Sequence, residues 1–250
     1  MEDISRRLLD NLIYRLWHWR CYYFHTADEN TSLTDIRTGK ITITAEDKTI
    51  IIDISQKGIV DVNGHDLVDL GLPSGTLWAT MNVGASSPEE NGNYYAWAET
   101  EVKESYDWNN YHYCNGTYNT VNKYTHWSDY FTRGGVRADN YTTIRTTDDA
   151  ASVNWGGVWR IPSYGEWEEI ISSSYCIWTW KTLNGIDGYE VKSKSNGSTI
   201  FLPHSGYWSS SLNLKYCYKA WGFSVDENYY KSNDGYHRCQ GLSVRPVCHP

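Results

Sequence analysis

The chain is poor in phenylalanine and methionine, and it has fewer basic than acidic residues. Only 4 Phe and 2 Met stand among 250 residues, against 13 Trp and 21 Tyr. Most of its large rings therefore carry a polar group, which suits half-exposed positions and recognition surfaces. The net charge is −8, with 22 Lys and Arg against 30 Asp and Glu. Because the basic footprint of a nucleic-acid-binding protein is missing, we expect no nucleic-acid partner.

Long apolar runs are also lacking. No stretch approaches the ~20 apolar residues that a membrane-spanning helix needs. The N-terminus begins with Met and two acids, and polar residues interrupt its apolar positions, so it lacks the apolar core of a signal peptide. These features predict no membrane insertion, and synthesis and folding in the cytoplasm.

Metal and disulfide signatures are missing as well. The cysteines are scattered, without a CxxC motif or a Cys/His ligand spacing. We interpret them as buried or free thiols, and we expect no metal and no cofactor. The six are Cys21, Cys114, Cys176, Cys217, Cys239 and Cys248.

At roughly 100–200 residues per domain, the length predicts one main domain with a small appendage. In the first 24 residues, apolar side chains recur at spacings of three and four, which predicts an amphipathic helix with a heptad-like seam. Such a helix either packs on its own domain or joins copies into a homo-oligomer. The seam consists of Leu9, Leu12, Leu16, Trp19 and Tyr23.

Short strands are expected after this helix. Lys40–Thr44 and Thr49–Ile54 are rich in β-branched residues and lie four residues apart, which predicts a hairpin. Val62 ends a third short strand before the turn pair Asn63-Gly64. We therefore interpret residues 1–64 as an appendage of one helix and short β-strands, for oligomerisation or attachment, and residues 65–250 as the main domain.

The main domain is rich in Gly, Trp, Tyr, Asn and Ser. Ser163 and Glu166 have the spacing of a capping box, which predicts the start of a helix. After that helix, the turn pairs Asn184-Gly185 and Asn196-Gly197 indicate strands and turns alone. The fold class expected is α+β, with a twisted antiparallel sheet and long loops. The strands expected are Cys176–Lys181, Gly188–Lys192, Thr199–Pro203, Tyr207–Ser211, Ala220–Val225 and Leu242–Val247.

Several segments of residues 65–250 resemble, in the same order, a domain that is abundant in gut Bacteroidales and their phages. The segments are Val68–Ala79, Asn82–Ala85, Tyr94–Glu99, Asp148–Ala151, Asn154–Pro162, Tyr207–Ser211 and Gly241–Val247. The resemblance implies a C-type-lectin-like fold, in the branch shared with formylglycine-generating enzymes. Members of that branch serve as adhesin tips and as the variable proteins of diversity-generating retroelements.

In the diversified members of this family, one C-terminal stretch varies while the scaffold stays fixed. The resemblance places that stretch at about residues 207–241. Its composition agrees, because residues 207–240 hold 6 of the 21 Tyr together with short polar residues, and Tyr offers rigid contact area at low entropy cost. Adenine-directed mutagenesis of asparagine codons yields the residue types found there. The alternative is an ordinary Tyr-rich loop of the same fold.

Ligand contacts are expected at ten positions of the variable stretch. They are Tyr216, Tyr218, Asn228, Tyr229, Tyr230, Ser232, Asn233, Asp234, Tyr236 and His237, with Leu214, Cys217 and Cys239 as further members. Alternation along a strand buries about every second side chain, so only part of this set can face a ligand. The alternative location is the long loop with Tyr111, Tyr113, Tyr118 and Tyr124. The positions expected to be structural are Trp208, Ala220, Trp221, Phe223, Arg238 and Arg245.

Enzyme signatures are weak. No Ser/His/Asp order, HExxH motif or glycine-rich phosphate loop occurs. Residues 160–167 resemble the formylglycine-generating pattern, but that chemistry needs a matched cysteine pair, and Cys217 and Cys239 lie in the presumed variable stretch. The Glu-Pro-Asn and Trp-Asn-Asp motifs of calcium-dependent lectins are also missing, and the pair Asp148-Asp149 fits a helix start better than a cation site. We expect a binding protein without catalytic residues.

Two biological contexts fit such a binding protein. A receptor-binding protein of a phage tail tip needs no signal peptide, because virions assemble in the cytoplasm, and it gains avidity from repeated copies. A bacterial surface or pilus-tip adhesin would need export. The sequence therefore predicts a cell-surface protein or glycan as partner. The expected location is the virion after cytoplasmic synthesis, with the bacterial cell surface as the alternative.

Overall fold

The computed structural model describes residues 37–45, 48–56, 61–127, 129, 135–227 and 229–249. All of them belong to one of two compact units, Thr31–Pro250. The expected N-terminal helix with its apolar seam lies outside the described residues, and so does Asn228. Ser232, Asn233 and Asp234 are described as strand backbone.

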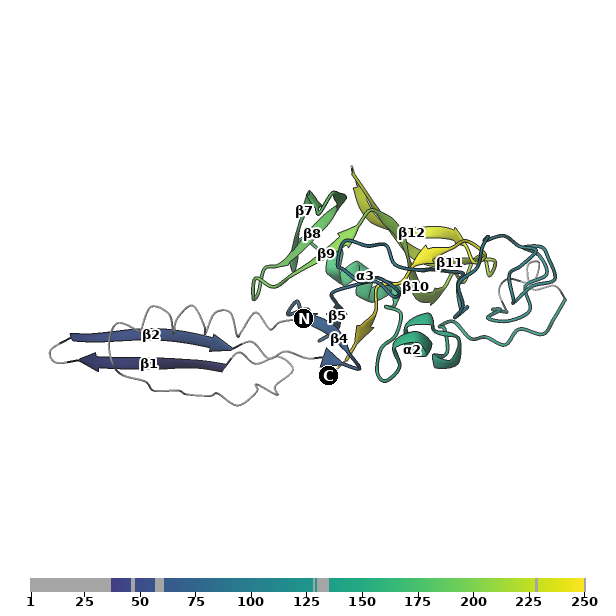
Figure 1. Cartoon of the computed structure of the whole chain (residues 1–250). Coiled ribbons are helices and arrows are strands. Elements are labelled where there is room, and N and C mark those ends of the chain that lie inside the picture. The colour runs from purple at the N-terminus through teal and green to yellow at the C-terminus, as the bar shows by residue number, and fades with distance from the viewer. Residues whose placement is uncertain are drawn as a thin grey trace. The chain divides into compact units, whose positions relative to one another are not determined.

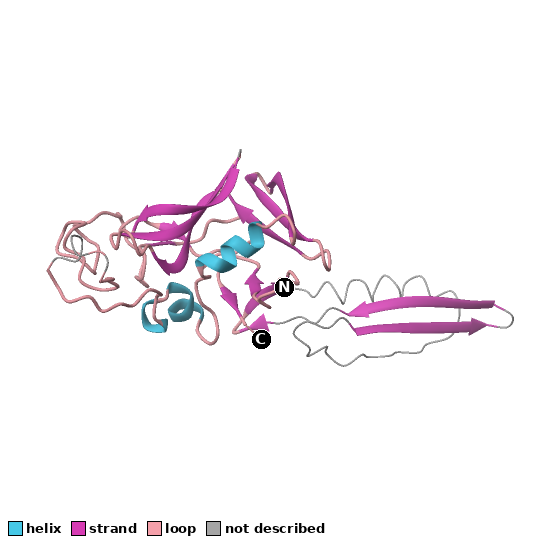
Figure 2. Cartoon of the chain, turned by 180° about the vertical axis from the view of Figure 1, so that it is seen from behind, coloured by secondary structure: helices cyan, strands magenta, loops and turns pink. Residues whose placement is uncertain are grey.

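Strands dominate the described part of the chain (Figures 1 and 2). The helical segments there are one 3-10 turn, η1 (Thr146–Asp148), and two short α-helices, α2 (Ala150–Trp155) and α3 (Tyr164–Ile171). The expected α+β class, with a helix-plus-strands appendage, is therefore wrong, because the described part is mostly antiparallel β-sheet. Capping signals in the sequence mark where helices start, but α2 has only six residues and α3 only eight, and strands and loops form the rest of the described chain.

Four sheets contain the strands of the described part. The largest has five strands in the order β12-β11-β10-β13-β6. All of its neighbouring pairs are antiparallel except β10 and β13. The strands are β1 (Arg37–Ala45), β2 (Lys48–Gln56), β3 (Asp61–Val62), β4 (His65–Asp69), β5 (Leu77–Ala79), β6 (Tyr94–Tyr95), β7 (Cys176–Leu183), β8 (Ile186–Ser193), β9 (Thr199–Pro203), β10 (Ser205–Leu212), β11 (Lys219–Asp226), β12 (Tyr229–His237), β13 (Leu242–Ser243) and β14 (Val247–Cys248).

Sequence reasoning did not predict β12. The expected strands before it are confirmed with small changes of bounds, and the last expected strand, Leu242–Val247, is divided into β13 and β14. The segment that forms β12 is rich in Asn, Ser, Asp and Gly, which disfavour strands. It becomes a strand because β11 offers it a partner along its whole length, from Asp226↔Tyr229 to Lys219↔His237.

The hairpin β1–β2 is confirmed, but its connection is shorter than expected. The two strands stay paired as far as Ala45↔Lys48, so two residues connect them where the sequence suggested four. β-Branched residues occupy consecutive positions in both strands, at residues 41–44 and 49–52, and favour the strand conformation there. Within the described residues, this pair forms a two-stranded sheet of its own.

Asn-Gly pairs close two further hairpins, one at the turn predicted between strands and one where the sequence predicted only the end of a strand. Asn184 and Gly185 have φ of 49° and 87° and join β7 to β8, and Asn63 and Gly64 have φ of 55° and 80° and join β3 to β4. Positive φ at both central residues matches the right-handed twist of the flanking strands. The boundary that we placed between residues 64 and 65 therefore falls inside the β3–β4 hairpin. Because Trp159 Nε1 donates to Val62 O at 2.8 Å, β3 packs with the main domain.

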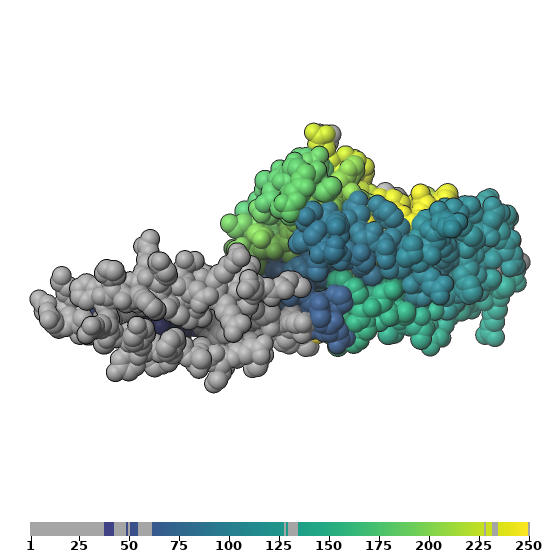
Figure 3. All heavy atoms as spheres, viewed as in Figure 1, coloured from purple at the N-terminus to yellow at the C-terminus, as the bar shows by residue number. Residues whose placement is uncertain are grey.

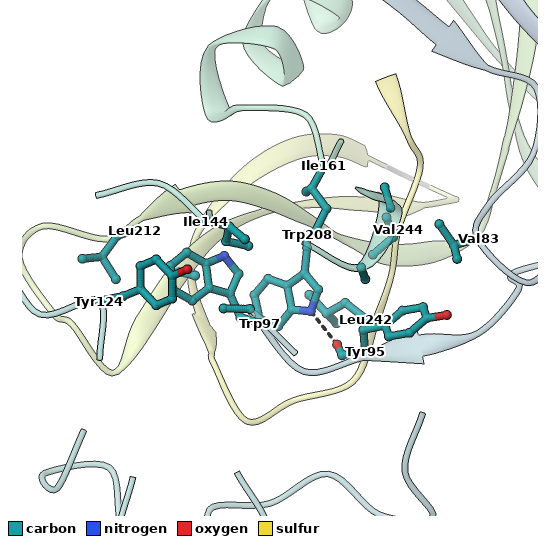
Figure 4. Packing of buried hydrophobic residues seen from close by; sticks show 14 of the residues in the cluster. Val83, Tyr95, Trp97, Tyr124, Ile144, Ile161, Trp208, Leu212, Leu242 and Val244 are labelled. Atoms are coloured by element: carbon teal, nitrogen blue, oxygen red, sulfur yellow. Dashed lines mark hydrogen bonds between the residues drawn. The ribbon is translucent and has the colours of Figure 1, made fainter. Parts of the chain in front are cut away.

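The largest buried residues are tryptophans, and backbone carbonyls accept the indole N–H groups of four of them, whereas Trp78 Nε1 has no hydrogen-bond partner among the described residues. Trp208 Nε1 donates to Tyr95 O at 2.6 Å (Figure 4). Trp97 Nε1 donates to Ser209 O at 2.8 Å. A buried indole N–H without a partner would cost stability. The chain can therefore use Trp where Phe is common elsewhere, because β6 and β10 present carbonyls to the core.

Candidate ligand-binding surface

The long loop between β6 and η1 is fixed to the end of β12 by a single buried side chain. Arg238, the residue after β12, is fully buried. Its Nε donates to Tyr111 Oη at 2.8 Å, and its Nη1 donates to Tyr124 O at 3.2 Å and to Cys217 O at 2.9 Å. Its Nη2 donates to Lys123 O at 2.9 Å. One guanidinium thus connects the long loop, the β10–β11 loop and β12.

Aromatic rings and oxygen dipoles surround the charge of Arg238. Its guanidinium carbon lies 4.8 Å from the Trp97 ring centroid, 5.3 Å from that of Tyr111 and 5.9 Å from that of Tyr124. Burial raises the pKa of Tyr111, so its hydroxyl keeps its proton and donates to Trp97 O at 2.9 Å. Cation–π contacts and hydrogen bonds of this kind offset the cost of burying a charge.

Five rings gather beside this anchor at the surface. We call them the aromatic patch: Trp108, Tyr118, Tyr216, Tyr218 and His237. Tyr218 is at its centre, with ring centroids 5.2 Å from Tyr118, 5.7 Å from Tyr216 and 5.6 Å from His237. Trp108 lies 5.9 Å from His237. Tyr118 is 51 % exposed and Tyr216 is 39 % exposed, so the patch presents aromatic surface to solvent.

The patch combines three segments that are distant in sequence. Trp108 and Tyr118 come from the long loop, Tyr216 and Tyr218 from the β10–β11 loop, and His237 from β12. In Figure 3 the blue and teal surface of the long loop meets the yellow surface of the C-terminal strands. Sequence reasoning named Tyr216, Tyr218 and His237 together, and Tyr118 as part of an alternative location. It missed Trp108, although the unusual length of the loop that contains this residue is typical of binding loops.

The β10–β11 loop has a local reason for its shape. Asn213 is buried, and its Oδ1 accepts from Lys215 N at 2.9 Å and from Tyr216 N at 3.0 Å. An Asn side chain often closes a turn in this way. The carboxylate of Asp129 accepts from Cys217 N inside the protein. These bonds fix the backbone, so the rings of the loop can face solvent without carrying the fold.

Two lysines lie against the patch. Lys215 Nζ is 5.1 Å from the Tyr216 ring centroid, and Lys219 Nζ is 5.9 Å from Tyr216 and 6.0 Å from Tyr218. Partial burial and the charge of Lys219 lower the pKa of His237, so this imidazole is neutral at pH 7. The two ammonium groups therefore supply the positive charge of the patch.

Two other predicted contact residues lie at the opposite end of β12. Tyr229 pairs with Asp226, whereas His237 pairs with Lys219, so the length of the nine-residue strand separates them. At ~3.4 Å per residue that length is about 27 Å. Tyr230 stacks on Trp178 with ring centroids 4.3 Å apart and planes 11° apart. The ten predicted residues therefore do not form one surface.

Tyr236 has a packing role. Its ring lies 5.9 Å from Trp208, and its hydroxyl shares a 2.5 Å hydrogen bond with Ser224 Oγ. The ring covers two glycines, and a Cβ atom at Gly222 would stand 2.5 Å from Tyr236 Cδ2. We expected an exposed contact residue here, and the structure instead shows a half-buried ring, because the absence of side chains at Gly206 and Gly222 opens a recess for it.

The expected structural positions are largely confirmed. Trp208, Ala220, Phe223, Arg238 and Arg245 are fully buried, whereas Trp221 is half-buried against Tyr164, with ring centroids 4.4 Å apart. Of the further contact candidates, Leu214 is exposed, but Cys217 and Cys239 are buried, and burial raises the pKa of both thiols to about 11. The five cysteines of the described part are free thiols.

Two acidic residues singled out in the sequence, Asp149 and Glu166, have structural roles. Asp149 caps α2 and accepts from Ala151 N at 2.9 Å and Ser152 N at 3.1 Å, as expected for a helix start. The capping box of Ser163 and Glu166 is also confirmed. Burial would raise the pKa of Glu166, but hydrogen bonds from Arg160 and other donors outweigh it and lower the pKa to about 2.

Comparisons with protein-family models, curated proteins and solved structures found no match. Within the described residues, no helix combines the length and apolar character needed to cross a membrane. The same residues contain no group of three or more His, Cys, Asp and Glu side chains that could hold a metal ion. The functional argument therefore starts from the aromatic patch.

Proposed function

We propose that the main domain recognises a ligand on a cell surface through the aromatic patch. The observation that carries this proposal is the meeting of five rings from three distant segments, two of them well exposed, at one place on the surface. Exposed clusters of large rings are typical of interaction sites, and Tyr and Trp dominate the energetics of interfaces. No core requirement explains the exposed rings of Tyr118 and Tyr216.

The way in which the patch is held supports the proposed diversification of residues 207–241. The Nη atoms of Arg238 bond to backbone carbonyls of Lys123, Tyr124 and Cys217. The neighbouring side chains at Tyr216 and Tyr218 are not part of these bonds. A surface that is fixed through main-chain atoms tolerates changes of side chain, which a variable recognition surface requires.

We further propose the tail tip of a phage virion as the place of action. The support is the resemblance of the segments between Val68 and Val247 to variable and adhesive proteins of Bacteroidales and their phages. Tail genes beside the gene would support this context, as would a reverse transcriptase with a template repeat. A secretion operon and no tail genes would contradict it and favour the surface adhesin.

The binding proposal is tested with the full chain on arrays of bacterial surface glycans and of surface proteins. The patch variant carries Tyr118→Ser, Tyr216→Ser and Tyr218→Ser. Its matched control is Tyr229→Ser, which removes a 45 % exposed ring at the other end of β12. We expect the patch variant to lose at least about tenfold in affinity, since truncating an aromatic hot spot often costs ~2 kcal/mol or more. Full binding by the patch variant, or loss in the control alone, contradicts the proposal.

A further inference from the structure

The charged side chains around the aromatic patch indicate the chemical class of its partner. Lys215 and Lys219 both hold their ammonium groups within 6 Å of the Tyr216 ring centroid. Within the described residues, neither lysine forms an ion pair. Lys103 and Lys123 of the long loop differ in this respect, because Glu99 and Asp148 neutralise them.

Carboxylates close to the patch are directed to backbone N–H groups. Asp129 is buried and accepts from Cys217 N. Asp107, next to Trp108, accepts from Asn109 N at 2.7 Å and from Asn110 N at 3.3 Å. Among the described residues, no carboxylate thus lies within ion-pair distance of these two ammonium groups, on a chain of net charge −8. Because both ammonium groups lie within 6 Å of the same ring centroid, these like charges repel each other, and one anion near both of them would relieve the repulsion.

The ring geometry favours a protein over a sugar as the source of that anion. The planes of neighbouring rings in the patch are inclined by 52° between Tyr216 and Tyr218, 63° between Tyr118 and Tyr218, and 66° between Tyr218 and His237. Inclined rings leave ridges and notches between them, and side chains of a protein surface can fill these, whereas a chain of sugar rings stacks best on faces that share a plane.

We propose that the partner is a protein whose surface presents Asp or Glu side chains to this patch. A partner carboxylate lies near Lys215 and Lys219, and neighbouring partner side chains pack between the rings. This inference rests on the proposed function, and it adds the chemical class of the ligand. Complementary charge at an interface speeds association and rejects partners of the wrong sign.

The test uses a display library of random peptides, selected separately against three forms of the full chain. These are the wild type, the patch-reversed variant Lys215→Glu/Lys219→Glu, and the matched control Lys192→Glu/Lys231→Glu. The control changes two exposed lysines away from the patch by the same total charge. Lys231 Nζ lies 5.2 Å from the Tyr229 ring centroid, close to the 5.1 Å between Lys215 Nζ and the Tyr216 ring centroid. Thermal melting confirms that all three are folded.

We expect the wild type and the control to enrich peptides rich in Asp and Glu, and the patch-reversed variant to enrich Lys and Arg. Peptides selected on the wild type should bind the patch-reversed variant at least about tenfold more weakly and the control within about twofold. The inference is overturned if the wild type enriches neutral or basic peptides. It is also overturned if the wild type and the patch-reversed variant select the same acidic peptides. Failure to enrich any peptide overturns it too, as does binding confined to glycans.

One further variant separates this inference from the proposed function. Peptides selected on the wild type are measured against Tyr216→Ser/Tyr218→Ser. If they bind it unchanged, the aromatic patch is not the binding surface and both proposals fail. If binding needs the two tyrosines but ignores the charge at Lys215 and Lys219, the patch stands and the acidic partner alone is wrong.

Discussion

Lys219 stands directly opposite His237 in the antiparallel pair of β11 and β12. Lys219 follows the loop that carries Tyr216 and Tyr218, and His237 precedes the buried Arg238. This one pairing therefore brings the exposed part of the candidate site and its internal anchor to the same end of the sheet. The charge of Lys219 also adds to burial in lowering the pKa of His237.

Arg238→Lys should destabilise the fold strongly. Lysine cannot reach Tyr111, Tyr124, Cys217 and Lys123 at once, so buried acceptors lose their donors. Breaking a buried charged network costs about 3–5 kcal/mol. Urea denaturation measures the loss, and the exposed Arg137→Lys provides the control. Equal stability of the two variants would show that Arg238 is not the anchor of the loop.

Trp208→Ala should cost about 3–5 kcal/mol of unfolding free energy, because it leaves a cavity and orphans Tyr95 O. Trp221→Ala should cost less, since Trp221 is only half-buried. Trp127, which is 69 % exposed, gives the control, and its replacement by Ala should change stability by about 0.5 kcal/mol or less. Differential scanning calorimetry would establish the order, and a larger loss for Trp221 than for Trp208 would contradict the core assignment.

Gly222→Ala should destabilise the sheet by about 1–3 kcal/mol through overpacking. The added Cβ would lie 2.5 Å from Tyr236 Cδ2 and 2.8 Å from Tyr207 O. The ring of Tyr236 would have to leave its recess beside Trp208. Gly39→Ala on β1 is the control, because nothing lies within 4 Å of a Cβ atom there. Chemical denaturation compares the two, and a neutral Gly222→Ala would mean that Tyr236 is free to move.

Glu166 should make the free energy of unfolding depend on pH. Its pKa falls from 4.5 to about 2 in the folded protein, so the folded state favours the carboxylate. The stabilisation is complete above about pH 4.5 and is lost as the pH falls towards 2. Its size is on the order of 3 kcal/mol.

The matching variant is Glu166→Gln. We expect the difference in unfolding free energy between wild type and Glu166→Gln to shrink between pH 5 and pH 2.5, as measured by urea denaturation at each pH. The exposed Glu104→Gln serves as the control, with a difference that stays near zero. A constant difference for Glu166→Gln would contradict the assigned interactions with Arg160 and Thr76.

The sequence correctly predicted features that depend on interactions between residues close together in the chain. The capping box at Ser163 and the Asn184-Gly185 turn depend on residues within a few positions of each other, and both are confirmed. The strand β12 was missed because its partner strand decides it against the propensity of its own residues. The fold class was wrong because spacing marks the start of a helix and not its length.

The candidate site depends on contacts that no local pattern reveals. Tyr118 and Tyr218 meet across a hundred residues because Arg238 fixes the backbone of both loops. Asn213, one of the short polar residues of the stretch 207–240, closes a turn from a buried position and presents no side chain to a ligand. Tyr236 was expected at the surface, and the glycine at 222 that gives it a recess lies on another strand.

Arg245 has a consequence for how the chain folds. Its guanidinium donates to carbonyls of Ala79, Thr80 and Phe201, and the partner at Ala79 lies 166 positions earlier. Next to it, β14 pairs with β5. Contacts between such distant segments form slowly, because a long loop must close before they gain any energy. During synthesis, β5 can pair early with the preceding strand β4, but its other edge stays unpaired until β14 has been made, 169 residues after Ala79, and is exposed to chaperones in the meantime.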